Sequence, residues 1–273
     1  MNLYLDCFSG IAGDMYLAAL LDLGLDISEL RKFLEPFEIP QLELKSSRVL
    51  KKGIEATYLH VHVGGADSEH GHHHHHDHHG HTFNDIVAFL RRQSIAPKLI
   101  QRTERVFRFI ADAESKVHGK PLDELHFHEV GQWDAIVDVV GVLWGLERLG
   151  VKEVYASAVN VGGGFVQFSH GCYPVPAPAT ANILQSAAIP FFTTPDVGEM
   201  LTPTGAALLA ETVTAFTSPG TMKVQKVAYG AGSRDIGNIP NVVRAMALES
   251  TDTQADRVVV IETNLDDMNP EFC

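Results

Sequence analysis

The sequence predicts an α/β or α+β fold in which helices pack on a mixed sheet, and three observations favour it. Short apolar or alternating segments, typical of strands, are interleaved with segments of helical periodicity. Of the 273 residues, 45% are hydrophobic and 20% are charged, so the chain can bury a large core. No internal repeat is visible, and the pattern is interrupted only at residues 65–81. We therefore expect 1–64 and 82–264 to form one α/β domain, with 65–81 as a flexible, disordered insertion.

The N-terminal part is expected to alternate between strands and helices. An apolar strand, LYLDCF, is followed by a helix that ends at Gly24, and a second helix stops before Pro36 because proline cannot continue it. Two alternating segments are joined around Lys51-Lys52-Gly53. The expected strands are 3–8, 41–50 and 53–63, and the expected helices are 14–23 and 28–35.

The part after the insertion is expected to be mainly helical before it returns to strands. Thr82 and Asp85 have the spacing of an N-cap with a carboxylate that reaches back. Pro97 opens an amphipathic helix for which Gly119 is the terminator. The expected helices are 82–92, 97–117, 133–149, 176–188 and 202–216, and the expected strands are 153–161, 221–229, 241–249 and 256–263.

Charge and composition exclude several classes of function. A formal net charge of −13 argues against nucleic acid or an anionic membrane as a partner, and leaves any anionic ligand to backbone donors and a few cations. The N-terminus has no basic region before Asp6, so we do not expect a signal peptide, and no apolar run has the length of a membrane span. Three scattered cysteines, Cys7, Cys172 and Cys273, indicate no disulfide framework. We expect a cytoplasmic homo-oligomer.

The segment HGHHHHHDHHGH at residues 70–81 contains nine of the fifteen histidines. Neutral imidazole is a suitable ligand for nickel, zinc and copper, and nine on a tether can bind more than one ion. The segment lies inside the chain, so it is not a terminal purification tag. A solvated loop with incidental metal affinity is the alternative. The predicted metal ligands here are His70, His72, His73, His74, His75, His76, His78, His79 and His81.

The turn DCFSGIAGDM, between the first strand and the first helix, is a candidate anion site. Ser9, Gly10 and Gly13 lie where backbone N–H groups at a helix N-terminus can bind a phosphate. Asp6 and Asp14 flank the turn and are candidate ligands of a hydrated metal ion bridged to that phosphate. The alternative is a plain turn in which Asp14 caps the helix.

The segment HFHEVGQWDAIVD is the strongest catalytic candidate. His126 and His128 would share one face of an extended segment, with Glu129 on the other face. Asp134 and Asp138 lie one helical turn apart. Such a cluster can bind a metal ion or supply a general base, so His126, His128, Glu129 and Asp134 are the candidate catalytic residues. The alternatives are structural roles: Asp134 at a helix N-terminus, Asp138 as a hydrogen-bonded residue of an otherwise apolar helix, and His128 as a structural histidine.

Three more loops are candidates for binding a substrate or its phosphate. A glycine triplet follows the strand at 153–161 and allows the backbone to approach a ligand closely, without Rossmann spacing. Two threonines stand at a helix start in LTPTG, and an arginine in YGAGSRD is a credible anion-binding cation in so acidic a chain. Each loop alone also fits an ordinary turn. The candidate residues are Gly162, Gly163, Gly164, Thr202, Thr204 and Arg234.

Motifs follow one another along nearly the whole chain: DCFSGIAGDM, the histidine-rich loop, HFHEVGQWDAIVDVVG, GGGF with SHG and PVPAPAT, GEMLTPTGAALL, YGAGSRD and ETNLDDMNPE. In this order they resemble the LarC family of nickel-insertion proteins. The resemblance implies a nickel chelatase or cyclometallase of the lyase class. It would place Ni(II) in pyridinium-3,5-bisthiocarboxylic acid mononucleotide through two Ni–S bonds and one Ni–C bond. The implied cofactors are nickel and CTP with a divalent metal, and lactate racemase is the implied recipient of the nickel-pincer product.

In the family, ETNLDDMNPE lies mid-chain and is followed by a C-terminal domain associated with CTP and its metal. This chain stops at Cys273, directly after the motif, so 265–273 is expected to be the junction to that domain. We therefore expect the C-terminal portion to be a partner that catalysis requires. Two other classes stay open: a nickel storage or delivery module without catalysis, and a metal-dependent phosphate-ester hydrolase.

Overall fold

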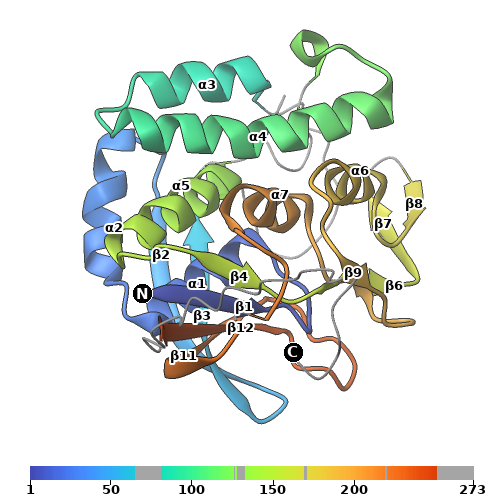
Figure 1. The fold of residues 1–273 in the computed structure, drawn as a ribbon. Helices are drawn as coiled ribbons and strands as arrows, with labels where there is room; N and C mark the ends of the chain where they lie inside the picture. The colour runs from blue at the N-terminus through green and yellow to red at the C-terminus, as the bar shows by residue number, and fades with distance from the viewer. Residues whose placement is uncertain (65–80, 126, 128–132, 169–170, 219, 251–273) are drawn as a thin grey trace, which may run out of the picture.

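The computed structural model describes residues 1–64, 81–125, 127, 133–168, 171–218 and 220–250, and in it helices pack on a mixed sheet (Figure 1). The predicted fold class is therefore confirmed. The main sheet has six strands. In chain order they are β1 Asn2–Asp6, β2 Glu43–Lys51, β3 Ile54–His62, β4 Val154–Ala156, β11 Met222–Ala231 and β12 Val242–Ser250.

Strands from both sides of the histidine segment join this sheet in the order β2–β3–β11–β12–β1–β4. β2 and β3 form an antiparallel hairpin, and β11 and β12 pair antiparallel to each other, as do β12 and β1. β3 pairs parallel to β11, and β1 pairs parallel to β4. Strand β1 is enclosed by two neighbours, and its alternate residues Leu3 and Leu5 are fully buried, as the period of two in a strand requires.

The helices of the described ranges form further layers over the sheet. They are α1 Gly13–Leu23, α2 Ile27–Leu34, α3 Phe83–Arg91, α4 Pro97–His118, α5 Trp133–Arg148, α6 Pro178–Ser186 and α7 Pro203–Thr212, with short 3₁₀ turns at Glu35–Phe37 and Leu122–Glu124. Helix α1 packs on β3, β11 and β12, and α5 packs on α1. The long helix α4 crosses α5, α6 and α7 on the side away from the sheet (Figure 1).

Helix boundaries are confirmed where the cap chemistry is visible in the sequence. The Thr82 hydroxyl accepts a hydrogen bond from the Asp85 backbone N–H at 3.1 Å, and the Asp85 carboxylate accepts one from the Thr82 backbone N–H at 2.9 Å. Helix α4 begins at Pro97 and ends before Gly119, whose φ of 62° lies in the left-handed region. Its predicted apolar stripe is buried: Leu99, Val106, Phe107, Ile110 and Ala113.

The prediction of a single strand at 153–161 is wrong. The segment divides into β4, which pairs with β1, and β5 Val159–Asn160, which pairs with β9 Phe191–Phe192. Ser157 lies at the division. Its hydroxyl accepts the Cys7 backbone N–H at 2.9 Å, which replaces the regular ladder beyond the end of β1. The apolar pattern continues through the break because both short strands are buried.

The glycine- and proline-rich connection at 162–180 contains strands that its composition does not predict. β6 Gly162–Gly163 pairs with β10 Gly198–Glu199, and β7 Phe165–Phe168 pairs with β8 Gly171–Pro174. These strands have two to four residues each, too few to show a period of two. The strand predicted at 256–263 lies outside the described residues.

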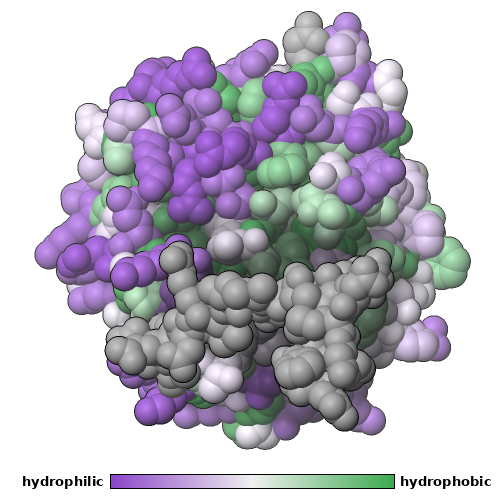
Figure 2. Space-filling view, viewed as in Figure 1, coloured by the Kyte–Doolittle hydropathy of each residue, from purple (hydrophilic) through white to green (hydrophobic). Residues whose placement is uncertain are grey.

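Figure 2 shows many hydrophilic residues on the surface over α3 and α4. This distribution agrees with the amphipathic pattern of α4, whose apolar stripe faces the other helices. Within the described ranges, no helix combines the length and the apolar character that crossing a membrane requires.

Candidate functional site

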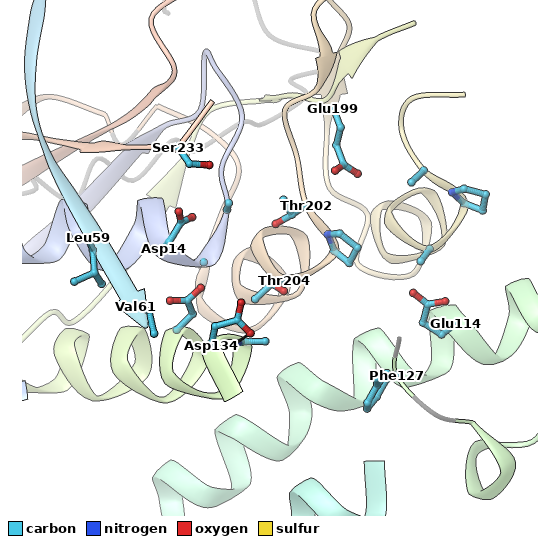
Figure 3. Close-up of a pocket in the computed structure, with 18 of the residues that line it drawn as sticks. Asp14, Leu59, Val61, Glu114, Phe127, Asp134, Glu199, Thr202, Thr204 and Ser233 are labelled. Atoms are coloured by element: carbon cyan, nitrogen blue, oxygen red, sulfur yellow. Dashed lines mark hydrogen bonds between the residues drawn. The ribbon is translucent and has the colours of Figure 1, made fainter. Parts of the chain in front are cut away.

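A pocket of about 420 Å³ opens where the first turns of α1, α5, α6 and α7 meet (Figure 3). Gly13, Asp134, Pro178 and Pro203 mark the four helix starts in its wall. Strand β3 and the C-terminal part of α4 also line the pocket, with Tyr58, Leu59, His60, Val61, Glu114, Val117 and His118.

Backbone contacts hold the turn before α1 against the start of α7. The Ile11 N–H donates to the Met200 carbonyl at 3.1 Å, and the Thr202 N–H donates to the Ile11 carbonyl at 3.4 Å. Glycine is required on both sides of this contact. A Cβ on Gly10, whose φ is +74°, would lie 2.0 Å from the Met200 oxygen, and a Cβ on Gly205 would lie 2.2 Å from the Ile11 oxygen. The structure thus brings two of the predicted binding loops together.

The four helix starts give one side of the pocket a positive potential. Backbone N–H groups in the first turn of a helix have no helical acceptor, and the helix dipole adds partial positive charge there. Several such ends around one space favour a bound anion such as a phosphate or a carboxylate. The Thr202 hydroxyl accepts the Gly205 N–H at 3.1 Å and so caps α7, and both Thr202 and Thr204 line the pocket.

Three aspartates from α1 and α5 line the same pocket, two of which Figure 3 labels. Asp14 and Asp134 each accept the backbone N–H of the following residue at 2.8 Å. The Oδ1 atom of Asp138 is buried and has no hydrogen-bond partner among the described residues. Gly13 makes this packing possible, because a Cβ there would lie 2.8 Å from Asp138 Oδ2.

Burial and mutual repulsion raise the pKa values of these carboxylates. Burial raises the pKa of Asp14 to about 6, with a further contribution from the charge of Asp134. Burial, and then the charges of Asp14 and Asp134, raise the pKa of Asp138 well above its usual range. Burial also raises the pKa of Asp134, although its side chain is the most open of the three to the pocket. Such carboxylates can accept and return a proton near neutral pH.

Asp14→Asn is expected to stabilise the fold at pH 7.5 by about 2 kcal/mol, because it removes a poorly solvated charge and keeps the acceptor for the Met15 N–H. The folded pKa of about 6 exceeds the ordinary value of 3.8, so the folded state binds the proton more tightly than the unfolded chain. The resulting stability is present below about pH 4 and is lost as the pH rises through 6. Urea unfolding across this range should show a difference between variant and parent that vanishes near pH 4. A variant less stable than the parent at pH 7.5 would contradict this account.

The family model described as nickel insertion protein matches residues 3–273. The chain belongs to this family. A putative nickel insertion protein of Geotalea daltonii is 43% identical over 99% of this chain and 67% of its own length. Proteins named pyridinium-3,5-bisthiocarboxylic acid mononucleotide nickel insertion protein in Desulfitobacterium hafniense (strain DSM 10664 / DCB-2) and Thermotoga petrophila are 41% and 46% identical. They match over 98% and 99% of this chain and over 65% and 66% of their own lengths. The chain thus spans about two thirds of these relatives, and no solved structure matches it.

Several of the site residues predicted from the sequence lie together in the pocket of this nickel insertion family member. Gly13, Asp14, Asp134, Thr202 and Thr204 all line it, although the sequence assigns them to three separate motifs. The motifs for the strand–helix turn, the catalytic segment and the LTPTG loop therefore contribute to one site.

Arg234 lies beside the pocket rather than in its wall. Its guanidinium donates to the backbone carbonyl of Glu199, and both Glu199 and Ser233 line the pocket. The positive charge of Arg234 reaches Asp14, where it opposes the rise in pKa. Arg234 is otherwise exposed to solvent.

Other nominated residues lie away from the pocket wall. Asp6 forms a salt bridge with Arg244, which neutralises its charge. Ser9 is fully buried, and its hydroxyl has no partner among the described residues. The triplet at 162–164 packs against 194–198: a Cβ on Gly162 would lie 1.9 Å from the Gly198 oxygen. These glycines therefore have a packing role in the structure.

His126, His128, Glu129 and the histidines from 70 to 79 lie outside the described residues, so their predicted roles stay predictions. His81 is described, and its ring packs edge-on against Trp133, with centroids 4.8 Å apart. In the described part of the chain, no group of three or more His, Cys, Asp or Glu side chains is arranged to hold a metal ion.

Several pocket residues are not among the candidate site residues, although Asp138 is named in the catalytic cluster. Asp138 carries a recognisable signal, because it is the only charged residue within the apolar run AIVDVVGVLWGL of α5. Of the others, Glu199 and Ser233 lie within the motifs GEMLTPTGAALL and YGAGSRD, but the approach of all of them to the pocket depends on tertiary structure. They are Tyr58, His60, Glu114, His118, Tyr173, Glu199 and Ser233.

Proposed function

We propose that this chain binds Ni(II) and takes part in its insertion into pyridinium-3,5-bisthiocarboxylic acid mononucleotide, and that this takes place in the pocket between α1, α5, α6 and α7. The observation that carries the proposal is the mixed charge of the pocket, in which four helix N-termini lie next to three aspartates. The names of the Desulfitobacterium and Thermotoga relatives support the choice of substrate.

The charges of that mononucleotide complement those of the pocket. Its phosphate and its two thiocarboxylates are anionic and suit the helix N-termini, with Arg234 at the edge. Its pyridinium ring is cationic and suits Asp14 and Asp138, as does Ni(II). A volume of about 420 Å³ lies within the usual range for a small-molecule site.

The aspartate pair supplies a proton acceptor for the insertion step. A nickel–carbon bond replaces a ring C–H bond, so one proton leaves the ring as Ni(II) binds that carbon and two sulfur atoms, and no electron is transferred. We assign this proton to Asp14 and Asp138, whose raised pKa values make them better bases than an ordinary aspartate. His126, His128, Glu129 and Asp134 stay proposed as catalytic groups.

The histidine segment is proposed to raise the concentration of nickel at this pocket. The residues on either side of the segment lie near the pocket. Before the segment, Val61 of β3 contributes to the pocket wall, and after it, His81 packs on Trp133 at the start of α5. Phe127, also in the wall, donates its backbone N–H to the His81 carbonyl at 3.4 Å. A tether fixed near a site at both ends holds its ligands at high effective concentration there.

The complete reaction is proposed to need the further third of length that the relatives have. We place CTP hydrolysis and its divalent metal in that part and assign no residue of this chain to them. The product is proposed to be the nickel-pincer cofactor of lactate racemase, made in the cytoplasm by a homo-oligomer of the lyase class.

Replacing the eight histidines between 70 and 79 with glutamine is expected to reduce the number of nickel ions bound and to leave insertion unchanged when nickel is in excess. The segment 70–80 has no apolar residue to bury, so the melting temperature without metal should not change. Calorimetric titration measures the nickel ions. Activation of lactate racemase, by this chain together with the C-terminal part, measures insertion. Insertion that excess nickel fails to restore would contradict the role of a concentrating tether.

The same assay separates the alternative functions. A storage or delivery module would bind nickel while insertion proceeds at full rate with variants of the pocket aspartates. A phosphate-ester hydrolase would release phosphate from a simple phosphate ester in the absence of nickel and of the mononucleotide. Nickel-dependent product that requires the pocket aspartates supports the proposal made here.

A further inference from the structure

Two histidines outside the histidine segment stand together at the pocket. His60 and His62 are alternate residues of β3, so their side chains lie on one face of the strand. Their imidazole rings are nearly parallel, at 9°, with centroids 6.3 Å apart. His60 is one of the residues that line the pocket, and its side chain is exposed to solvent.

The neighbouring strand places charged groups directly opposite this pair. Glu43 of β2 faces His62 and Lys45 faces His60 across the antiparallel register, and Lys45 forms a salt bridge with Glu43 at 2.6 Å. The pKa of Glu43 is lowered chiefly by Lys45, with smaller contributions from His62 and His60, as expected for a carboxylate beside the imidazoles. A dication that reaches the pair therefore has an anionic group beside it, and Lys45 opposes its binding.

We propose that His60 and His62 form a two-histidine nickel site at the pocket, from which nickel passes to the sulfur atoms of the substrate. Two imidazoles in His-X-His spacing on one strand face can bind one ion after a small rotation of the rings, since a metal–nitrogen bond is about 2.0–2.1 Å long. The absence of a third protein ligand among the described residues suits a transfer site. Water fills the remaining positions, and thiocarboxylate sulfur can displace it.

The site deepens the proposed function and rests on it for the transfer step, whereas nickel binding by the pair can be tested without substrate. It also gives nickel a position in the same pocket wall as the aspartates. His70, the first histidine of the segment, follows His62 by eight residues in the sequence, and His60 shares the pocket wall with Asp14 and Asp138.

The test compares nickel binding by full-length chains in which the eight histidines at 70–79 are already glutamine. In this background, His60→Gln with His62→Gln is expected to bind about one nickel ion fewer per chain in calorimetric titration with nickel chloride. Asp112→Asn is the control, because Asp112 is a partly exposed side chain able to bind a metal ion but lies outside the pocket on α4, where it pairs with Arg108 at 2.9 Å. Its isotherm should equal that of the background chain.

Lys45→Gln is expected to have the opposite effect on nickel affinity. Removing the positive charge opposite His60 is expected to tighten nickel binding roughly two- to fivefold, because an exposed charge of like sign acts weakly at this range. The side chains of His60, His62, Lys45 and Asp112 are partly or fully exposed, so circular dichroism melting of these variants should match that of the background chain. An isotherm unchanged by the double histidine substitution would overturn the proposal. Loss of binding in the double variant with full insertion activity at limiting nickel would overturn the transfer role alone.

The two proposals fail in different assays. Insertion at limiting nickel is expected to slow about tenfold in the double histidine variant and to recover when nickel is in excess. A substitution of the pocket aspartates should slow insertion at limiting and at excess nickel alike, so excess nickel should not rescue it. Failure of the titration therefore removes the histidine site and leaves the pocket proposal in place.

Discussion

Asp138→Asn is expected to reduce nickel insertion by roughly 10²- to 10⁴-fold and to raise the melting temperature. The substitution removes the proposed proton acceptor, and it also removes a buried charge that destabilises the fold. The carboxylate is buried next to Asp14, and its Oδ1 atom has no partner among the described residues. Asparagine keeps the size of the side chain but cannot accept a proton at neutral pH. Single-turnover formation of the nickel-bound product, followed by its absorbance with nickel in excess, measures the loss.

Asp112→Asn is the control for this prediction. Asp112 lies on the exposed side of α4, where it pairs with Arg108 at 2.9 Å. Its removal should change neither insertion nor stability by more than a small amount, since an exposed pair contributes at most about 1 kcal/mol. A folded Asp138→Asn variant that inserts nickel at a near-normal rate would show that the proton goes elsewhere. The candidates would then be His126, His128 and Glu129.

Gly230→Ala is expected to lower the free energy of unfolding by at least about 3 kcal/mol, the largest effect on stability that we predict. Helix α1 lies directly on β11 at this residue. A Cβ there would lie 1.9 Å from the Met15 carbonyl oxygen and 2.6 Å from the Ala19 nitrogen, both of which are backbone atoms of α1. The helix must therefore move away from the sheet, and Asp14 moves with it.

The control for Gly230 is Gly53→Ala in the turn between β2 and β3. No atom lies within 4 Å of a Cβ at Gly53, and its φ of +86° gives a cost of about 1 kcal/mol from backbone strain alone. Urea unfolding of both variants measures the difference. Equal losses at the two positions would mean that α1 is not held tightly against the sheet.

The elements that could be predicted from the sequence are those with local signals. The capping residues Thr82 and Asp85 give the start of α3, and Pro97 and Gly119 give both ends of α4, because caps act within one helical turn. Alternation likewise gives β2 and β3, since each has nine residues with a turn between them. The strand order has no local signal: Asn2 of β1 pairs with Leu248 of β12 at the other end of the described chain.

The pocket could be predicted only in part, for the same reason. Gly13, Asp14 and Thr202 belong to motifs whose residue types suggest a binding site, but their approach depends on the contact between Ile11 and Met200. The glycine triplet at 162–164 was predicted to bind a ligand but packs against residues 194–198. The sequence cannot distinguish the two roles, because both need a residue without a Cβ. Asp138 was visible as one charge in an apolar helix, yet its partner Asp14 lies on a different helix.

The central claim is that nickel and the mononucleotide meet in the pocket between α1, α5, α6 and α7. Diffraction data at the nickel absorption edge, from crystals of the longer family protein with the nickel-bound product, test it most directly. We predict an anomalous peak inside the pocket walls, beside Asp138 and Thr204, with the phosphate at a helix N-terminus. Product with its nickel at any place outside these walls would contradict the account.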